Sequence, residues 1–492
     1  MGNRFVFVNL SIRSGYNSGI NHGLAYLVPI VKKYGYEPHV INMRSEMSVD
    51  DFASKVDSLN PSIVGFSCVS NQLVNLTKYS RAIKGKKLLQ LAGGVAATLE
   101  PEELLSSTSV DGACVGEGEI PLNNLLENIK HGRDIFGTDG FCWRRGEGVR
   151  KSPAVQFITD LSELEFPDYS IFEDYIVSNR GNLLITLSRG CPYNCTYCCN
   201  EAIRKVYPSP KKYFRVPSVE HSIALLVRMV ARYPGTRYIQ FEDDLLISDK
   251  EWFGNFSQEY KKRIDLPYSC CVRGEYINTD IAKYLKSSNC VKVLIGLESG
   301  NERLRNELLS RRYSNALFLE KAKIIKDQGI ELYTFNMVGF PTETEEALRD
   351  TLKLNMMAQA DNGICTFFYP YRGTELYRLC QRDGLLKEEA SQITNYNTRP
   401  AIRLIGMSEK ACIRYQRKIT NYLVSQAVKY NYKKYAMKNP GFMKYPHYLY
   451  LWFALWAKPN LVRIVFSSTI LFSVFSKVKR HIYGKKAQLE RV

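Results

Sequence analysis

The sequence has 492 residues, which is long enough for two or three domains that each bury a core. The sequence opens with a run typical of a first β-strand rather than of a signal peptide. Without a signal peptide, the 13 cysteines are not expected to form a disulfide framework, and the protein is predicted to be cytoplasmic. The formal net charge is +18, and residues 371–492 alone carry 23 Lys and Arg against 6 Asp and Glu. The basic character is therefore expected in the C-terminal region.

Strand and helix patterns alternate over the first 130 residues. Runs typical of strands cover 5–10, 37–41, 62–67, 87–91 and 111–115, and helical patterns cover 23–34, 50–59, 73–84, 101–105 and 120–129. This alternation predicts an α/β domain of residues 1–135 with a parallel, doubly wound, Rossmann-like sheet. Ligands bind at the carboxyl ends of strands in such sheets. Small or polar residues follow three of these ends, and the candidate ligand contacts there are Ser67, Val69, Gly93, Gly94, Gly116 and Glu117.

A stretch of polar and aromatic residues, 136–180, is interpreted as a linker. The alternation then resumes, with strand patterns at 183–187, 238–241, 268–272, 291–297, 331–338 and 365–369. Six strand–helix units predict a partial (β/α)₆ barrel over residues 181–380, and barrel enzymes place their chemistry at the carboxyl ends of the strands. The residues that follow these ends include Glu242, Asp243, Asp244, Arg273, Glu298, Ser299 and Gly339.

Three cysteines follow the first barrel strand at the spacing C-x-x-x-C-x-x-C, namely Cys191, Cys195 and Cys198. Thiolate ligands select zinc or iron–sulfur. A structural zinc site takes four ligands, usually as two pairs, and no second pair is found nearby, whereas three close cysteines suit a [4Fe–4S] cluster that keeps one iron open. The motif therefore predicts such a cluster. Cys199 is a further thiol to which the pattern assigns no role.

The cysteine spacing, the preceding strand and Tyr197 before the last cysteine resemble the radical S-adenosylmethionine (SAM) enzymes. This resemblance implies that the open iron binds the amino and carboxylate groups of SAM, and that an electron donor such as flavodoxin or ferredoxin drives reductive cleavage to a 5′-deoxyadenosyl radical. It also implies that Glu242 and Asp243 lie near the SAM amino group, Glu298 and Ser299 near its ribose or carboxylate, and the Gly339 backbone near adenine. Arg273 is a candidate for a two-pronged hydrogen bond to the SAM carboxylate.

The N-terminal element order, with the glycine-containing stretch 15–19 after the first strand, resembles the cobalamin-binding domain that precedes the barrel in one large radical SAM class. The resemblance implies that the residues at 67–69 and 93–94 line the nucleotide tail of cobalamin. The D-x-H-x-x-G motif of that family is absent, because His22 has Ile20 two residues before it and Ala25 three residues after it. His22 is therefore predicted to be a hydrogen-bonding loop residue rather than a cobalt ligand. A cofactor-free flavodoxin-like scaffold is the competing interpretation.

The C-terminal region, residues 381–492, reads as helical, basic and aromatic. Its two most apolar runs, 445–456 and 461–475, are shorter than the about 20 residues of a membrane-spanning helix and lie near clustered lysines. They are typical either of helices on an anionic membrane surface, here at the cytoplasmic face, or of a helical subdomain packed on the barrel. Nucleic acid is a less favoured partner, because no binding module is recognised.

Together these resemblances imply a radical SAM enzyme that, with cobalamin, methylates or rearranges an unactivated carbon of a small-molecule or lipid-like substrate. A second interpretation is a tRNA methylthiotransferase, which would use three further cluster cysteines in its N-terminal domain; Cys68, Cys114 and Cys142 are the cysteines available. A cobalamin-free radical SAM enzyme and a non-enzymatic cofactor-binding module are the third and fourth interpretations.

Overall fold

The computed structural model describes residues 3–12, 19–146, 148–247, 249–388, 393 and 395–438. The chain divides into two compact units, Met1–Ile419 and Thr420–Val492, and both β-sheets belong to the first. Two sequence predictions lie outside the described residues: most of the stretch 15–19 after the first strand, and both apolar runs of the C-terminal region.

The first sheet has the strand order β2-β1-β3-β4-β5-β6-β7. Its first five strands are parallel, which confirms the predicted doubly wound domain. The strands are β1 (Arg4–Leu10), β2 (Glu37–Met43), β3 (Ile63–Ser67), β4 (Leu89–Gly93), β5 (Gly112–Cys114), β6 (Phe141–Arg145) and β7 (Gly148–Arg150). The helices of this domain are α1 (His22–Lys33), α2 (Val49–Leu59), α3 (Leu73–Ala82), α4 (Val95–Leu99), α5 (Pro101–Ser107) and α6 (Glu119–Lys130), and a single 3₁₀ turn, Ser70–Gln72, precedes α3.

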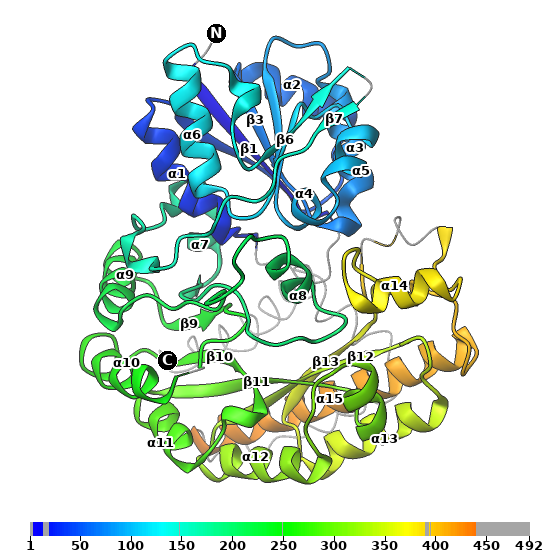
Figure 1. Cartoon of the computed structure of the whole chain (residues 1–492). Coiled ribbons are helices and arrows are strands. Elements are labelled where there is room, and N and C mark those ends of the chain that lie inside the picture. Colours follow the sequence, from blue (N-terminus) through cyan, green and yellow to red (C-terminus); the bar gives the residue numbers. More distant parts are fainter. Residues whose placement is uncertain are drawn as a thin grey trace, which may run out of the picture. The chain divides into compact units, whose positions relative to one another are not determined.

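Alternate residues of β1 pack on opposite faces of this sheet. Phe5 and Phe7 belong to a buried cluster with apolar residues of α1 and α6, whereas Val6 and Val8 belong to a second cluster with residues of α2 and α3. Alternation is expected because successive strand side chains point to opposite faces. Both faces of the sheet are therefore covered by helices (Figure 1).

The predicted linker over residues 136–180 is wrong in its first part. Strands β6 and β7 form an antiparallel extension on the edge of β5, so the first sheet continues to Arg150. Gly112 makes room for this extension, because a Cβ atom there would lie 2.6 Å from the ring of Trp143, which is fully buried. The rest of the stretch holds two short 3₁₀ turns, Leu161–Glu163 and Tyr169–Phe172, and the helix α7 (Glu173–Ser178).

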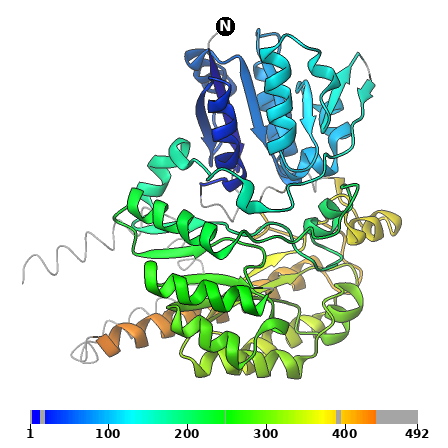
Figure 2. The same cartoon turned by 60° about the vertical axis from the view of Figure 1, so that its left-hand side comes forward.

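The second sheet has the order β13-β12-β11-β10-β9-β8, and all its neighbouring strands are parallel. Its strands are β8 (Asn182–Ile185), β9 (Tyr238–Phe241), β10 (Tyr268–Val272), β11 (Cys290–Glu298), β12 (Glu331–Val338) and β13 (Asn362–Phe367). The connecting helices are α8 (Cys199–Arg204), α9 (Val219–Arg232), α10 (Lys250–Arg263), α11 (Thr279–Ser287), α12 (Asn315–Asp327) and α13 (Glu345–Met357). Figure 2 shows helices along the outer side of this sheet. The predicted partial (β/α)₆ barrel is confirmed, although β13 begins and ends earlier than expected.

Two helices follow the barrel, α14 (Glu375–Arg382) and α15 (Glu409–Lys438). Leu376 and Cys380 of α14 are buried, as are Cys412 and Ile419 of α15. In the described part of the chain, no helix is long and apolar enough to cross a membrane.

Candidate functional site

The cysteine motif lies in the loop between β8 and α8, and Asp243 fixes the start of this loop. Its Oδ1 accepts hydrogen bonds from the Leu187 amide at 2.9 Å and from the Ser188 hydroxyl at 2.6 Å, and the Ser188 amide donates to the same oxygen. Asp243 is 1% exposed, and burial raises its pKa to about 6. Its carboxylate, expected near the SAM amino group, is thus engaged with the end of β8.

The loop itself is tightly turned around the three cysteines. Gly190 has a φ of 78°, and a Cβ atom there would lie 2.5 Å from the Tyr213 carbonyl oxygen, so glycine is required before Cys191. The Cys198 amide donates to the Cys195 carbonyl at 3.0 Å. Cys195 is buried, whereas Cys191 and Cys198 are partly exposed, and burial raises the pKa of the Cys191 thiol to about 11.

The loop offers three thiols, Cys191, Cys195 and Cys198, which is the type of ligand that an iron–sulfur cluster takes. Among the described residues, no group of three or more His, Cys, Asp or Glu side chains is arranged to hold one ion. Three thiolate donors on one loop leave the fourth iron open, as the sequence predicts.

Two arginines hold the cysteine loop from the barrel side. The Arg273 Nη1 donates to Cys195 Sγ at 3.3 Å, and its guanidinium lies 3.6 Å from the centroid of the Tyr193 ring. The Arg311 Nη1 donates to the Tyr197 hydroxyl at 2.9 Å and lies 3.4 Å from Glu298 Oε1. Arg311 was not a sequence candidate, because it follows no strand end and belongs to no recognised motif.

Arg273 already has a carboxylate partner in the chain. Its Nε and Nη2 atoms both donate to the Glu275 carboxylate, and Nη2 also donates to the Arg311 carbonyl at 3.3 Å. The edge of the guanidinium that was expected to bind the SAM carboxylate in a two-pronged way thus already binds Glu275.

The end of β11 carries an unusual backbone at Glu298. Its φ is 63°, a conformation that non-glycine residues rarely adopt, and the strand register shifts between Gly296 and Glu298. Burial raises the pKa of Glu298, and Arg311 opposes this effect. Ser299 is fully buried, with its carbonyl accepting a hydrogen bond from Arg305 Nη1 at 2.8 Å. The two predicted residues thus lie at a strained strand end beside a buried arginine.

Gly339, at the end of β12, is held by the carboxyl group of Glu343, which was not among the candidate site residues. The Gly339 amide donates to Glu343 Oε2 at 2.6 Å, and the Phe340 amide donates to the same oxygen at 3.3 Å. Glu343 is 1% exposed, and burial raises its pKa to about 8. Glu343 therefore fixes the turn whose backbone is predicted to meet adenine.

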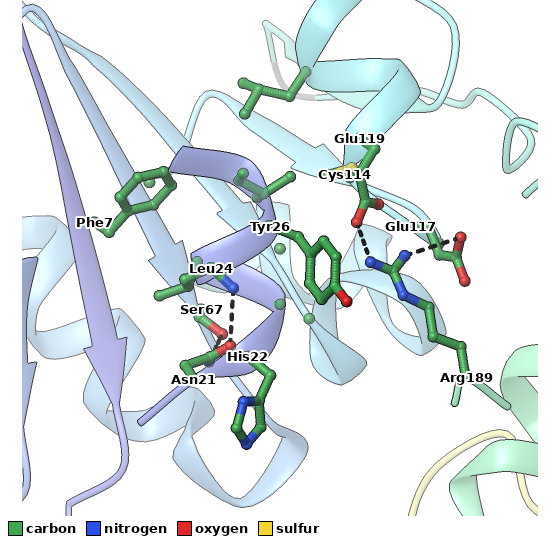
Figure 3. A pocket seen from close by; sticks show the side chains of 18 of the residues that line it. Phe7, Asn21, His22, Leu24, Tyr26, Ser67, Cys114, Glu117, Glu119 and Arg189 are labelled. Carbon is green, nitrogen blue, oxygen red and sulfur yellow. Dashed lines mark hydrogen bonds and ion pairs between the residues drawn. The ribbon is translucent and has the colours of Figure 1, made fainter. Parts of the chain in front are cut away.

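A cavity of about 400 Å³ lies at the carboxyl ends of the first sheet, beneath α1 and α6 (Figure 3). Ser67, Gly93, Gly94, Gly116 and Glu117 of the predicted set line it, and Val69 does not; Thr186–Gly190 of the barrel complete its wall. Its apolar lining includes Phe5, Phe7, Leu24, Leu91, Leu122 and Phe141.

Glycines keep this cavity open. A Cβ atom built on Gly93 would meet no other atom within 4 Å, so a side chain there would point into empty space that a ligand could fill. Gly94 has a φ of 93°, and a Cβ there would lie 2.8 Å from the Cys68 carbonyl oxygen. A largely apolar cavity with glycine and serine on its wall fits the nucleotide tail of a cobalamin.

A charge cluster joins the cavity to the cysteine loop (Figure 3). Arg189 Nη2 lies 2.6 Å from Glu119 Oε1, and its Nη1 lies 3.3 Å from Glu117 Oε2. Arg215 also pairs with Glu117, and the backbones of Arg189 and Arg215 form a β-bridge. Since Arg189 is two residues before Cys191, the carboxylates of the first domain hold the base of the cysteine loop.

His22 was predicted to lie in a loop, and this part of the prediction is wrong: His22 is the first residue of α1, because Asn21 caps the helix before it. Its hydrogen-bonding role is confirmed: Nδ1 lies 2.8 Å from the Tyr169 hydroxyl and Nε2 lies 3.1 Å from Glu242 Oε2. Glu242 Oε1 also accepts from Gln240 Nε2 at 3.2 Å. The Glu242 carboxylate, which the resemblance places near the SAM amino group, is thus oriented by the first domain.

Family models match both halves of this architecture. The radical SAM superfamily matches residues 185–354, and the B12 binding domain matches residues 11–126. The chain belongs to the radical SAM superfamily and carries a B12-binding domain. Its cofactors are accordingly a [4Fe–4S] cluster, SAM and cobalamin, which agrees with the donor set of the cysteine loop and with the cavity.

Individual relatives support the same architecture. The chain is 25% identical to a protein named as an uncharacterized methyltransferase of Pyrococcus horikoshii, over 74% of this chain and 79% of that protein. It is 23% identical to an anaerobic magnesium-protoporphyrin IX monomethyl ester cyclase of Rubrivivax gelatinosus, over 72% and 65% of the two chains. The structure of TsrM from Kitasatospora setae, a radical SAM methyltransferase with cobalamin and a [4Fe–4S] cluster bound, matches with a TM-score of 0.62, 16% identity and 85% coverage of each chain.

The methylthiotransferase interpretation has less support. A tRNA-2-methylthio-N(6)-dimethylallyladenosine synthase of Anoxybacillus flavithermus is 23% identical over 57% of this chain and 54% of that protein. Cys68, Cys114 and Cys142, the cysteines available for its additional cluster, are all buried in the first domain. The Cys68 and Cys142 thiols donate to backbone carbonyls nearby.

Proposed function

We propose that this radical SAM enzyme is a cobalamin-dependent methyltransferase that methylates an unactivated carbon of a small-molecule or lipid-like substrate. The observation that carries the proposal is the shared wall of the cavity. Thr186–Gly190, which lead directly into Cys191, line the same cavity as Ser67, Gly93 and Gly94 of the B12-binding domain. A corrinoid in that cavity would lie next to the cluster loop.

The residues of the chain have separate tasks in this proposal. Cys191, Cys195 and Cys198 hold the cluster, and the cavity of the first domain holds the cobalamin. The bound cofactors supply reductive cleavage of SAM and a methyl group for transfer. Glu242, held by His22, faces the SAM amino group, and Glu298, paired with Arg311, faces its ribose or carboxylate. Glu343 keeps the Gly339 backbone in place for adenine.

The lipid-like part of the substrate class rests on the sequence of the C-terminal region. Its apolar and basic runs suit peripheral binding to an anionic membrane, where an apolar substrate would be found. A cyclase-type rearrangement is the competing outcome, because several relatives carry that name.

The decisive experiment follows the fate of SAM. Reconstituted protein is incubated anaerobically with SAM and a low-potential reductant, with and without cobalamin, and the products are quantified. A methyltransferase forms S-adenosylhomocysteine only when cobalamin is present. Formation of 5′-deoxyadenosine alone, whether or not cobalamin is bound, would favour a rearrangement and contradict the proposal.

A further inference from the structure

Arg273 makes an ion-to-sulfur contact that the proposed roles leave unused. It is the one arginine for which the described structure records a hydrogen bond to a motif cysteine, with Nη1 donating to Cys195 Sγ at 3.3 Å. Both groups are buried, at 7% and 6% exposure. A full positive charge therefore lies against a predicted cluster ligand in a region from which water is largely excluded.

The contact is held from three sides. The guanidinium stacks on Tyr193, which lies in the loop between Cys191 and Cys195, at 3.6 Å from the ring centroid. The Arg311 carbonyl accepts from Nη2, and the Glu275 carboxylate accepts from Nε and Nη2. These partners fix the plane of the guanidinium, so that Nη1 is left to face the sulfur.

The charge of Arg273 is only partly balanced. Glu275 is its carboxylate partner, and the Glu275 side chain is 25% exposed, against 8% for the side chain of Arg273. Solvent screens the more exposed carboxylate better than it screens the buried guanidinium. The contribution of the Arg273–Glu275 pair at Cys195 is therefore positive.

We propose that Arg273 is a redox-tuning residue, which raises the reduction potential of the cluster through its charged hydrogen bond to Cys195; this inference rests on the proposed cluster. Reduction adds one electron from an external low-potential donor, and no bond at Arg273 forms or breaks. A cluster on three thiolates gains negative charge in this step, so a nearby positive charge favours the reduced form. Hydrogen bonds to the sulfurs and net charge are known determinants of such potentials.

The role differs from the one that the sequence alone suggests. A residue that binds the SAM carboxylate would affect the cluster only when SAM is present. A residue that donates to the cysteine sulfur acts on the cluster in the absence of SAM. The two roles are therefore separated by measuring the potential without SAM.

The test is a redox titration of the reconstituted full-length protein with titanium(III) citrate, in which the reduced cluster is followed by electron paramagnetic resonance, first without SAM. Arg273→Gln removes the charge and should lower the midpoint, so that only a minor fraction of the cluster is reduced at the wild-type midpoint. Arg273→Lys keeps the charge but loses the planar stacking on Tyr193, and its midpoint should lie between those of the wild type and Arg273→Gln. Glu275→Gln removes the balancing carboxylate and should raise the midpoint.

Opposite shifts from Arg273→Gln and Glu275→Gln would not arise from general loosening of the loop. An unchanged midpoint in Arg273→Gln without SAM, together with weaker SAM binding, would overturn the inference and assign Arg273 to SAM. If Arg273→Gln cannot hold iron, Glu275→Gln decides alone: a raised midpoint supports the inference, and an unchanged or lowered one rejects it. If wild-type protein holds no cluster, the proposed function itself fails.

Discussion

At the residue scale, several buried ionisable side chains near the cysteine loop hold neighbouring segments in place. Asp243 fixes the end of β8, Arg311 reaches Tyr197, and Glu343 fixes the turn after β12. Each of these groups holds its neighbours through hydrogen bonds that its own side chain makes. Removing such a group therefore has consequences for both the site and stability.

Replacing Cys195 by Ala removes a thiolate donor from the predicted cluster. We expect the reconstituted variant to lose most of its iron–sulfur absorption and all formation of 5′-deoxyadenosine from SAM. Cys199→Ala is the matched control, because Cys199 is the adjacent thiol outside the motif. A Cys195→Ala protein that still cleaves SAM would contradict the assignment.

Glu343 makes stability depend on pH in a predictable direction. Its pKa in the folded protein is about 8, above the ordinary value of 4.5, so folding favours the protonated form. The resulting stability is fully present below about pH 4.5 and is lost as pH rises through 8. Between pH 6 and 8 the free energy of unfolding should fall by about 2 kcal/mol from this group alone.

Glu343→Gln should remove this part of the pH dependence, because the amide oxygen can still accept from the Gly339 and Phe340 amides. The measurement is urea unfolding of the cofactor-free protein at both pH values. An equal fall in wild type and variant would mean that Glu343 is ionised in the folded protein.

At the element scale, sequence patterns located the strand ends but not the contacts made between domains. Regular alternation placed β3, β4 and β12 within a few residues, because buried strands carry a continuous apolar signal. The short edge strands β6 and β7 were missed, since their charged residues and turn resemble a linker. Arg189 and Glu119 are 70 residues apart, and no local pattern predicts their pairing.

The charge cluster between the domains yields a stability prediction. Glu119→Gln leaves the Arg189 guanidinium short of one buried partner, and we expect a loss of about 3 kcal/mol in the free energy of unfolding. Asp327→Asn, in the exposed Lys323–Asp327 pair of α12, is the control and should leave unfolding nearly unchanged. An equally small change in the free energy of unfolding of both variants would show that the charge cluster stabilises the protein no more than a surface ion pair does.

At the scale of the whole molecule, buried residues of α14 and α15 determine where the C-terminal region can be truncated without unfolding the rest. A chain ending near residue 383 would lose buried residues such as Ile402 and Cys412, and we expect it to misfold. A chain ending after residue 438 keeps them and removes nine Lys and Arg against one Glu.

We expect this shorter chain to lose binding to anionic vesicles in a sedimentation assay, while the full-length protein binds and is released by salt. Neutral vesicles serve as the control. Equal binding of both chains would assign the apolar runs to packing within the protein rather than to a membrane.

The central claim is that one chain holds both a [4Fe–4S] cluster and a cobalamin on adjoining walls. The most direct measurement is anaerobic reconstitution with iron, sulfide and hydroxocobalamin, followed by desalting and quantitation of iron and cobalamin per chain. We predict about four irons and about one cobalamin. Four irons with no retained cobalamin would contradict the claim and reduce the first domain to a scaffold, and about eight irons would favour a second cluster.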